Sequence, residues 1–194
     1  MKENMALPKG YAVPQGTPKE NKYAKIADGK NKFRILSDII TGYIWWEDED
    51  GKRVPHRVED FKEIPAEVLS RTEDRAKHFW AMVAYEYASK DVKILEISQA
   101  TVQKALESYE KSEDWGDLKD YDITIERKGK ERDTVYSVLP SPKKAIDEGI
   151  LVFYKELNVD LTQLYVNGNP FESTKVDTDG LVKGFNAATA DLDK

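Results

Sequence analysis

Five stretches in the centre of the chain carry the alternating or β-branched pattern that is typical of strands. Residues 32–36 and 41–46 predict one long strand that bends at Gly42, where a bulge or kink is easily accommodated. The other four predicted strands cover residues 78–87, 92–97, 121–126 and 134–139. In the strand at 78–87, alternate residues form two faces that both carry apolar side chains, which indicates that the strand is covered on both sides.

Two further stretches have the spacing of amphipathic helices. One helix is predicted over residues 99–112, after Ser98, which has the chemistry of an N-cap. A second is predicted over residues 143–158, with an apolar face that packs against the sheet. The apolar positions are Val102, Ala105, Leu106 and Tyr109 in the first helix, and Ile146, Ile150, Phe153 and Leu157 in the second.

The order of these elements predicts a mainly β protein with some helix, of the α+β class. Three strands, a helix and two more strands follow each other, as in the OB-fold, a five-stranded Greek-key barrel with a helix between strands 3 and 4. The second predicted helix then forms a C-terminal helical extension. Other small β-domains also contain a single helix, so the element order alone leaves them open.

Composition divides the chain into a core with two appendages. Residues 1–30 are rich in proline, glycine and lysine, and we expect a flexible basic N-terminal arm. Residues 31–142 form the predicted barrel, interrupted by a long polar insertion at 47–77. Residues 143–176 make the helical extension, and residues 177–194 an acidic flexible tail.

Charge is distributed unevenly over the 194 residues. The net charge is −6, but residues 1–34 hold eight Lys/Arg against three Asp/Glu, and residues 145–194 hold four against nine. The chain has no cysteine, no apolar run long enough to span a bilayer and no apolar signal segment at its start. We therefore expect a cytoplasmic protein without disulfides and without a membrane partner.

No catalytic motif is present, so the sequence does not predict an enzyme or a cofactor. A phosphate-binding glycine loop, a His-Glu-x-x-His pair and a Gly-x-Ser-x-Gly turn are all missing. His56 and His78 lie far apart in the sequence and have no cysteine partners, which argues against a zinc site. The acidic run at 47–50 could hold a hard cation, but a solvated turn is the simpler interpretation, and no metal is predicted.

Aromatic residues interleaved with basic ones are the main functional signal. Single-stranded nucleic acid is bound by flat rings that stack on bases and by cations that contact phosphates. Because neighbouring strand residues point to opposite faces, Trp45 and Trp46 cannot both enter one core, and we predict that Trp46 faces outward. The residues predicted to contact DNA are Arg34, Tyr43, Trp46, Arg53, Arg57, Lys77, Trp80, Tyr85, Tyr87 and Lys93.

Seven short blocks follow one another along the chain: NKFRILS at 31–37, ITGY at 40–43, KHFWA at 77–81, ILEI at 94–97, DWGD at 114–117, YDITI at 121–125 and PSP at 140–142. Taken in order, these blocks resemble a family of tailed-phage single-stranded DNA-binding proteins. The resemblance covers about residues 25–170 and implies an OB-fold that coats single-stranded DNA in replication, recombination and repair, largely regardless of sequence. It also implies that replication or recombination proteins bind the acidic C-terminal tail. Some relatives carry a structural zinc, which this cysteine-free chain does not share.

Two other functions fit the same residues. Exposed tryptophan and tyrosine also stack on sugar rings, so a carbohydrate- or peptide-binding β-domain is an alternative. A scaffold protein that holds replication enzymes is a second. The opposite charges of the two ends of the chain further suggest self-association along DNA, in which the arm reaches the neighbouring subunit.

Overall fold

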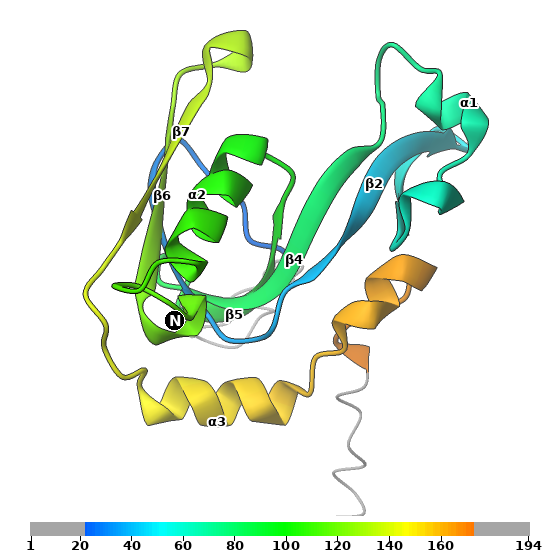
Figure 1. Cartoon of the computed structure of the whole chain (residues 1–194). Helices are drawn as coiled ribbons and strands as arrows, with labels where there is room; N and C mark the ends of the chain where they lie inside the picture. The colour runs from blue at the N-terminus through cyan, green and yellow to red at the C-terminus, as the bar shows by residue number, and fades with distance from the viewer. Residues whose placement is uncertain (1–21, 173–194) are drawn as a thin grey trace, which may run out of the picture.

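Seven strands form one mostly antiparallel, open sheet in the computed structural model, which describes residues 22–172 (Figure 1). The strand order is β3-β2-β4-β1-β6-β7, and β5 pairs with β4. With its few helices, the structure belongs to the α+β class, as predicted. The strands are β1 Gly29–Ile35, β2 Ile40–Glu49, β3 Lys52–Val58, β4 Lys77–Glu86, β5 Asp91–Ile97, β6 Asp122–Lys128 and β7 Val135–Pro140.

The predicted long bent strand is two strands, β1 and β2, and both pair with β4. Between them the chain stays on the same edge of β4, where the amide of Val83 donates to Ser37 Oγ and its carbonyl accepts from the amide of Leu36. Gly42 is needed for close packing and does not mark a bend. A Cβ at this position would collide with the carbonyl oxygen of Val58 on β3, so β2 can pair on both sides only with glycine there.

The insertion at 47–77 is more regular than its sequence indicated. It contains β3, which pairs with β2 along its whole length, followed by the 3-10 helix η1 (Phe61–Glu63) and the short helix α1 (Ala66–Leu69). The sequence KRVPHRV of β3 lacks the alternation of apolar and polar residues that is typical of a strand, because an arginine, Arg57, occupies a buried position. Its charge is matched by Glu96 of β5, which is a contact that local sequence cannot show.

The two faces of β4 are both buried, as its pattern predicted. Met82 and Ala84 belong to a first core, which is covered by α2 (Ala100–Glu110) and closed by β6 and β7. Phe79, Ala81 and Val83 belong to a second core on the opposite face. The 3-10 helix η4 (Leu161–Val166) covers this second core with Leu161 and Leu164, and Phe171 adds to it.

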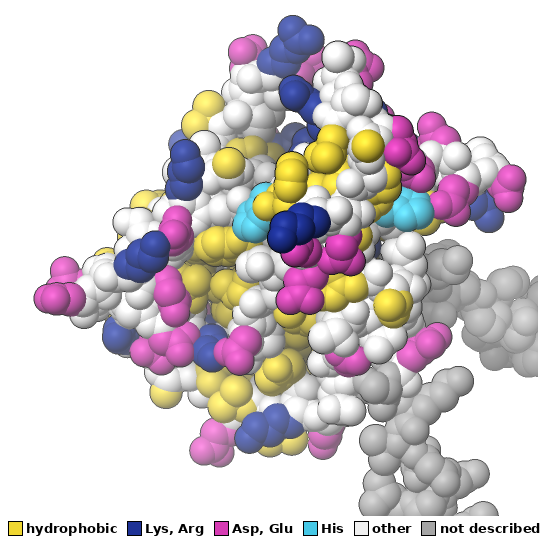
Figure 2. Space-filling view, turned by 45° about the vertical axis from the view of Figure 1, so that its right-hand side comes forward, with side chains coloured by type: hydrophobic (Ala, Val, Ile, Leu, Met, Phe, Trp, Pro, Cys, Tyr) yellow, Lys and Arg dark blue, Asp and Glu magenta, His cyan; other side chains and the backbone are white. Residues whose placement is uncertain are grey.

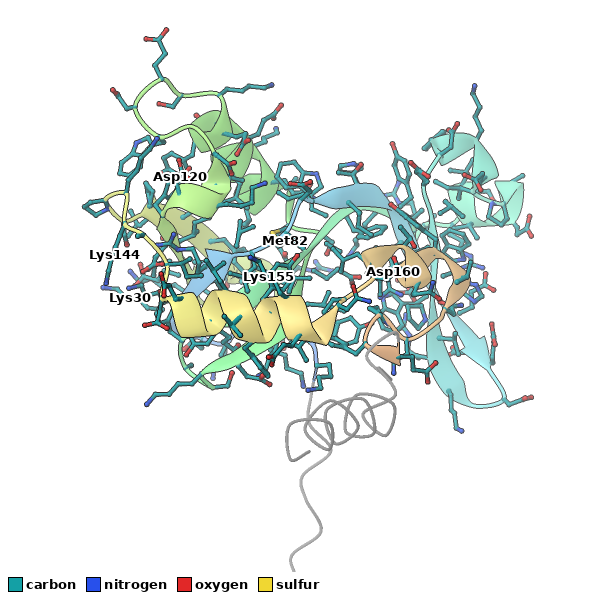
Figure 3. All side chains as sticks on the ribbon, turned by 90° about the horizontal axis from the view of Figure 1, so that it is seen from below. Lys30, Met82, Asp120, Lys144, Lys155 and Asp160 are labelled. Carbon is teal, nitrogen blue, oxygen red and sulfur yellow. The ribbon has the colours of Figure 1, made fainter. Side chains whose placement is uncertain are left out.

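Both predicted helices exist, but the second is shorter than expected. Helix α2 begins after Gln99 rather than Ser98, and Gln99 makes no capping side-chain hydrogen bond. Helix α3 (Glu148–Leu157) begins after Asp147, which accepts a hydrogen bond from the amide of Gly149. It crosses the underside of the molecule between Lys144 and Asp160, and no residue of it is fully buried (Figure 3). The expected docking of its apolar face is therefore limited, and the tighter cover over the second core comes from η4.

The sheet does not close into the predicted five-stranded barrel. Within residues 22–172, β5 pairs with β4 and makes no ladder with β7. The free edge of β5 is instead met by Tyr23, which forms a parallel bridge with Ile94, and Ile94 bonds to the backbone of Lys22 and Ala24. Residues 22–30, placed in the arm by the sequence, thus join the fold. Residues 1–21 of the predicted arm and the predicted tail at 177–194 lie outside the described residues.

Candidate nucleic-acid interface

The hairpin of β2 and β3 separates the two adjacent tryptophans. Trp45 is 5% exposed and packs with Ile64 and Val68 in a small core beneath α1, whereas Trp46 is 41% exposed on the opposite face. Alternation of side chains along β2 is the cause. The predicted outward orientation of Trp46 is confirmed, and its contact with DNA remains a prediction.

Two arginine side chains contact Trp46, one at its ring and one at its backbone. The guanidinium carbon of Arg53 lies 5.9 Å from the ring centroid, a cation–π contact, and Arg53 also pairs with Asp74 at 3.0 Å. Arg71 reaches the carbonyl oxygen of Trp46 at 3.4 Å. Because the Arg53–Asp74 pair is exposed to solvent, it is weak, and the guanidinium can exchange its partner at little cost.

A cavity of about 200 Å³ opens beside Trp46. Lys77 and Arg75 line it together with Asp74 and Glu96, so that cations and carboxylates are present in equal number. Lys77 and Arg75 are both exposed, and the described residues show no ion pair for either of them. We call Trp46, Arg53, Arg75 and Lys77 the Trp46 surface; it offers one flat ring and three exposed cations.

Three predicted phosphate ligands are held inside the fold. Arg34 is 2% exposed and is bonded to Asp122 at 2.7 Å and to the carbonyl oxygens of Lys119 and Lys144. Arg57 is buried against Glu96 at 2.8 Å and lies over the ring of Phe79. The ammonium group of Lys93 pairs with Glu86 at 2.6 Å, and both side chains are largely buried. Each of these three cations is therefore neutralised by a carboxylate inside the fold and is not available to a phosphate, contrary to the prediction.

Tyr85 and Tyr87 form an edge-to-face pair, 5.1 Å between centroids, away from the Trp46 surface. Tyr87 donates to Asp122 at 2.9 Å, and the ammonium group of Lys32 lies 4.6 Å from its ring centroid. Burial, and then the hydrogen bond to Asp122, raises the pKa of Tyr87 to about 12. Lys32 thus occupies one face of the Tyr87 ring. The pair of Tyr85 and Tyr87 packs on itself and holds Asp122 in place.

Tyr43 and Trp80 also lie in surroundings that do not favour phosphate. Tyr43 contacts Phe61 and His78 edge to face, beside a groove of about 620 Å³ whose charged groups are Glu59, Asp60 and Glu63. On this face, apolar side chains gather between the two histidines, with a basic side chain and carboxylates close by (Figure 2). Trp80 packs against the first core and lines a separate cavity of about 250 Å³.

Sequence reasoning missed Arg71 and Arg75, because it selected only the basic residues that directly flank the predicted aromatic strands. The pairing of β2 with β4 is what brings Arg75 close to Trp46. Among the described residues, one group brings metal-ligating atoms together, namely Glu47, Glu49 and His56. It lies on the Trp45 face of the hairpin, opposite the Trp46 surface.

In residues 22–172, no helix has both the length and the apolar character needed to cross a bilayer. Comparison of the chain with protein-family models, with curated proteins and with solved structures finds no match in any of the three.

Proposed function

We propose that this protein binds single-stranded DNA without strong sequence preference, and that it coats the strand in phage DNA replication, recombination and repair. The observation that carries the proposal is the Trp46 surface, in which an exposed indole has Arg53 over it and Lys77 and Arg75 beside it. Unpaired bases present flat faces to stack on such a ring, and the adjacent phosphates require cations within reach. Neither contact depends on base identity.

The order and pairing of the strands support this proposal, because they match those of an OB-type sheet that stays open. Taken together, β1 and β2 act as a first strand broken at residues 36–39, followed by β4, β5, the helix α2, β6 and β7. The pairings of β4 with β5, of β6 with β1 and of β7 with β6 have the OB order. In OB-folds the face of the second and third strands and the loop after the first strand bind oligonucleotides.

The position of η4 explains why the binding surface lies at the hairpin. In this chain, Leu161 and Leu164 cover the outer face of β4 and β5, which is the usual OB binding face. The connection after the first strand, which contains the β2–β3 hairpin, is left uncovered at Trp46. We therefore assign the DNA contact to this connection and not to the middle of the sheet.

Replacing Trp46 with alanine is expected to weaken binding of oligo-dT by roughly 1–3 kcal/mol, because one base loses its stacking partner. The measurement is a fluorescence titration in which DNA quenches tryptophan emission in the parent protein. Phe153→Ala is the matched control, since Phe153 on α3 is an aromatic residue of equal exposure, 42%, away from the hairpin. Parental affinity in folded Trp46→Ala would remove this ring from the interface.

Removing the positive charge of Arg53 or Lys77 is expected to flatten the plot of log affinity against log salt by about 0.7 for each phosphate that the protein no longer neutralises. Alanine variants of both residues, titrated with oligo-dT at several salt concentrations, measure this slope. Lys104→Ala is the control, because Lys104 is exposed on α2 and lies outside the Trp46 surface. A parental slope in either variant would show that the replaced side chain does not touch a phosphate.

The same titrations separate the alternative functions. A carbohydrate- or peptide-binding domain would respond to its ligand with little salt dependence, whereas binding through phosphates weakens steeply as salt rises. A scaffold protein would show no quenching by oligo-dT at any salt concentration. Duplex DNA and oligo-A RNA as competitors test the preference for single-stranded DNA.

A further inference from the structure

Three ionisable side chains converge on the Trp45 face of the β2–β3 hairpin. The Nε2 atom of His56 lies 2.8 Å from Glu49 Oε1 and 3.7 Å from Glu47 Oε2. One ligand atom from each residue can be chosen so that all three lie within 4.8 Å of one another. The two His56 distances lie on either side of the roughly 3.3 Å between ligand atoms of a tetrahedral ion with bonds of about 2 Å.

The strand register produces this convergence. Glu47 and Glu49 are two residues apart on β2 and so point to the same face as Trp45. His56 lies opposite Trp45 on β3, which places it diagonally across from Glu47. Two carboxylates side by side on one sheet face repel each other, and a cation between them relieves that repulsion.

Neighbouring side chains orient the group. Arg71 and the indole N–H of Trp45 both donate to Glu47 Oε1, so that Oε2 faces His56. The ring of Trp45 stacks on the imidazole with centroids 5.6 Å apart and planes 17° from parallel. Ligands that are held in place by outer hydrogen bonds and packing are typical of protein metal sites.

We propose that Glu47, Glu49 and His56 bind a divalent transition-metal ion of the zinc class. One imidazole nitrogen and two carboxylates suit zinc or cobalt, whereas calcium and magnesium prefer oxygen ligands alone. The side chain of Glu49 is 53% exposed, so water completes the coordination from the solvent side. The bound ion ties β2 to β3 and stiffens the hairpin that carries Trp46 and Arg53 on its other face.

The test is a calorimetric titration of the untagged full chain with zinc, together with the visible absorption spectrum after addition of cobalt. We expect one ion per chain in the parent protein. His56→Ala and Glu49→Gln are each expected to weaken binding by tenfold or more, in line with the loss of a ligand. His78→Gln is the matched control, because His78 is the other histidine of the chain, is exposed, and should leave the affinity unchanged.

A second readout reports the location of the ion. A paramagnetic ion such as copper at His56 should quench the emission of the stacked Trp45, and this quenching should disappear in His56→Ala. Circular dichroism establishes that each variant is folded; Glu49→Gln changes an exposed side chain and decides the question if His56→Ala does not fold. Parental zinc affinity in folded Glu49→Gln, or no saturable binding in the parent, overturns the proposal. Neither readout involves DNA, so the metal site and the DNA-binding function fail independently.

Discussion

Asp122→Asn is expected to lower the free energy of unfolding by about 3–5 kcal/mol, because it removes the negative charge that compensates a buried guanidinium. Asp122 accepts from Arg34 at 2.7 Å, from Lys32 at 2.9 Å and from Tyr87 at 2.9 Å. Asparagine keeps the shape of the side chain and leaves Arg34, at 2% exposure, without a counter-charge. Chemical denaturation at neutral pH measures the difference.

Acid should abolish this difference. Burial alone would raise the pKa of Asp122, but hydrogen bonds from Lys32, Arg34 and Tyr87 outweigh it and hold the pKa below the usual value. A lowered pKa stabilises the fold above the pKa of the unfolded chain, about 3.9, and this contribution is lost as the pH falls through the folded-state pKa. The stabilities of the parent and Asp122→Asn should therefore begin to approach each other below about pH 4, and should converge only below the lowered folded-state pKa of Asp122.

Asp38→Asn is the control for the ion-pair argument. Asp38 also pairs with a cation, Lys119, at 2.6 Å, but its side chain is 93% exposed. Water screens that pair, so its removal should change the stability little. A large destabilisation in Asp38→Asn, or none in Asp122→Asn at neutral pH, would contradict the role of Asp122 as the buried counter-charge of Arg34.

Trp45→Ala is expected to lower the free energy of unfolding by about 3–5 kcal/mol, since it empties most of the small core under α1. Trp45 is 5% exposed and packs on Ile64 and Val68, which have few other buried neighbours in that cluster. The indole also donates to Glu47 Oε1 at 3.2 Å. Thermal and chemical denaturation measure the change in stability.

Trp46→Ala supplies the comparison within the same dipeptide. Its ring is on the exposed face, so the fold should keep most of its stability while DNA binding weakens. Opposite effects of two adjacent substitutions, on stability for Trp45 and on binding for Trp46, would be difficult to explain without the alternation seen in β2. Equal destabilisation by both substitutions would instead show that the hairpin is covered on both faces.

Much of the secondary structure could be predicted from local pattern. The strand at 78–87 and the helix at 99–112 were correct within two residues at each end, because their periodicity is carried by strongly apolar residues such as Phe79, Val83, Val102 and Leu106. Prediction failed for β3, where a buried arginine and a proline break the apolar alternation. It also joined β1 to β2, because both runs are apolar and the break at residues 36–39 involves a hydrogen bond from β4 to Ser37 that local sequence does not show.

The candidate site was predicted less completely. Sequence reasoning selected basic residues near aromatic ones, and this rule could not distinguish Arg53 and Lys77 from Arg34, Arg57 and Lys93. The difference lies in distant partners: Asp122 is 88 residues from Arg34, and Glu96 is 39 residues from Arg57. A cation that meets a carboxylate in the interior contributes to folding, and one without such a partner is available to a ligand.

The sequence by itself determined the β-rich class, the two-sided burial of β4 and the opposite directions of Trp45 and Trp46, because these follow from periods of two and 3.6 along the backbone. Only the tertiary structure decided that the sheet stays open, with Tyr23 at the edge of β5, and that η4 covers the outer face of β4 and β5. It alone decided which cations are paired. Sheet closure and ion pairing depend on segments far apart in the chain, and distance in space is not encoded in local order.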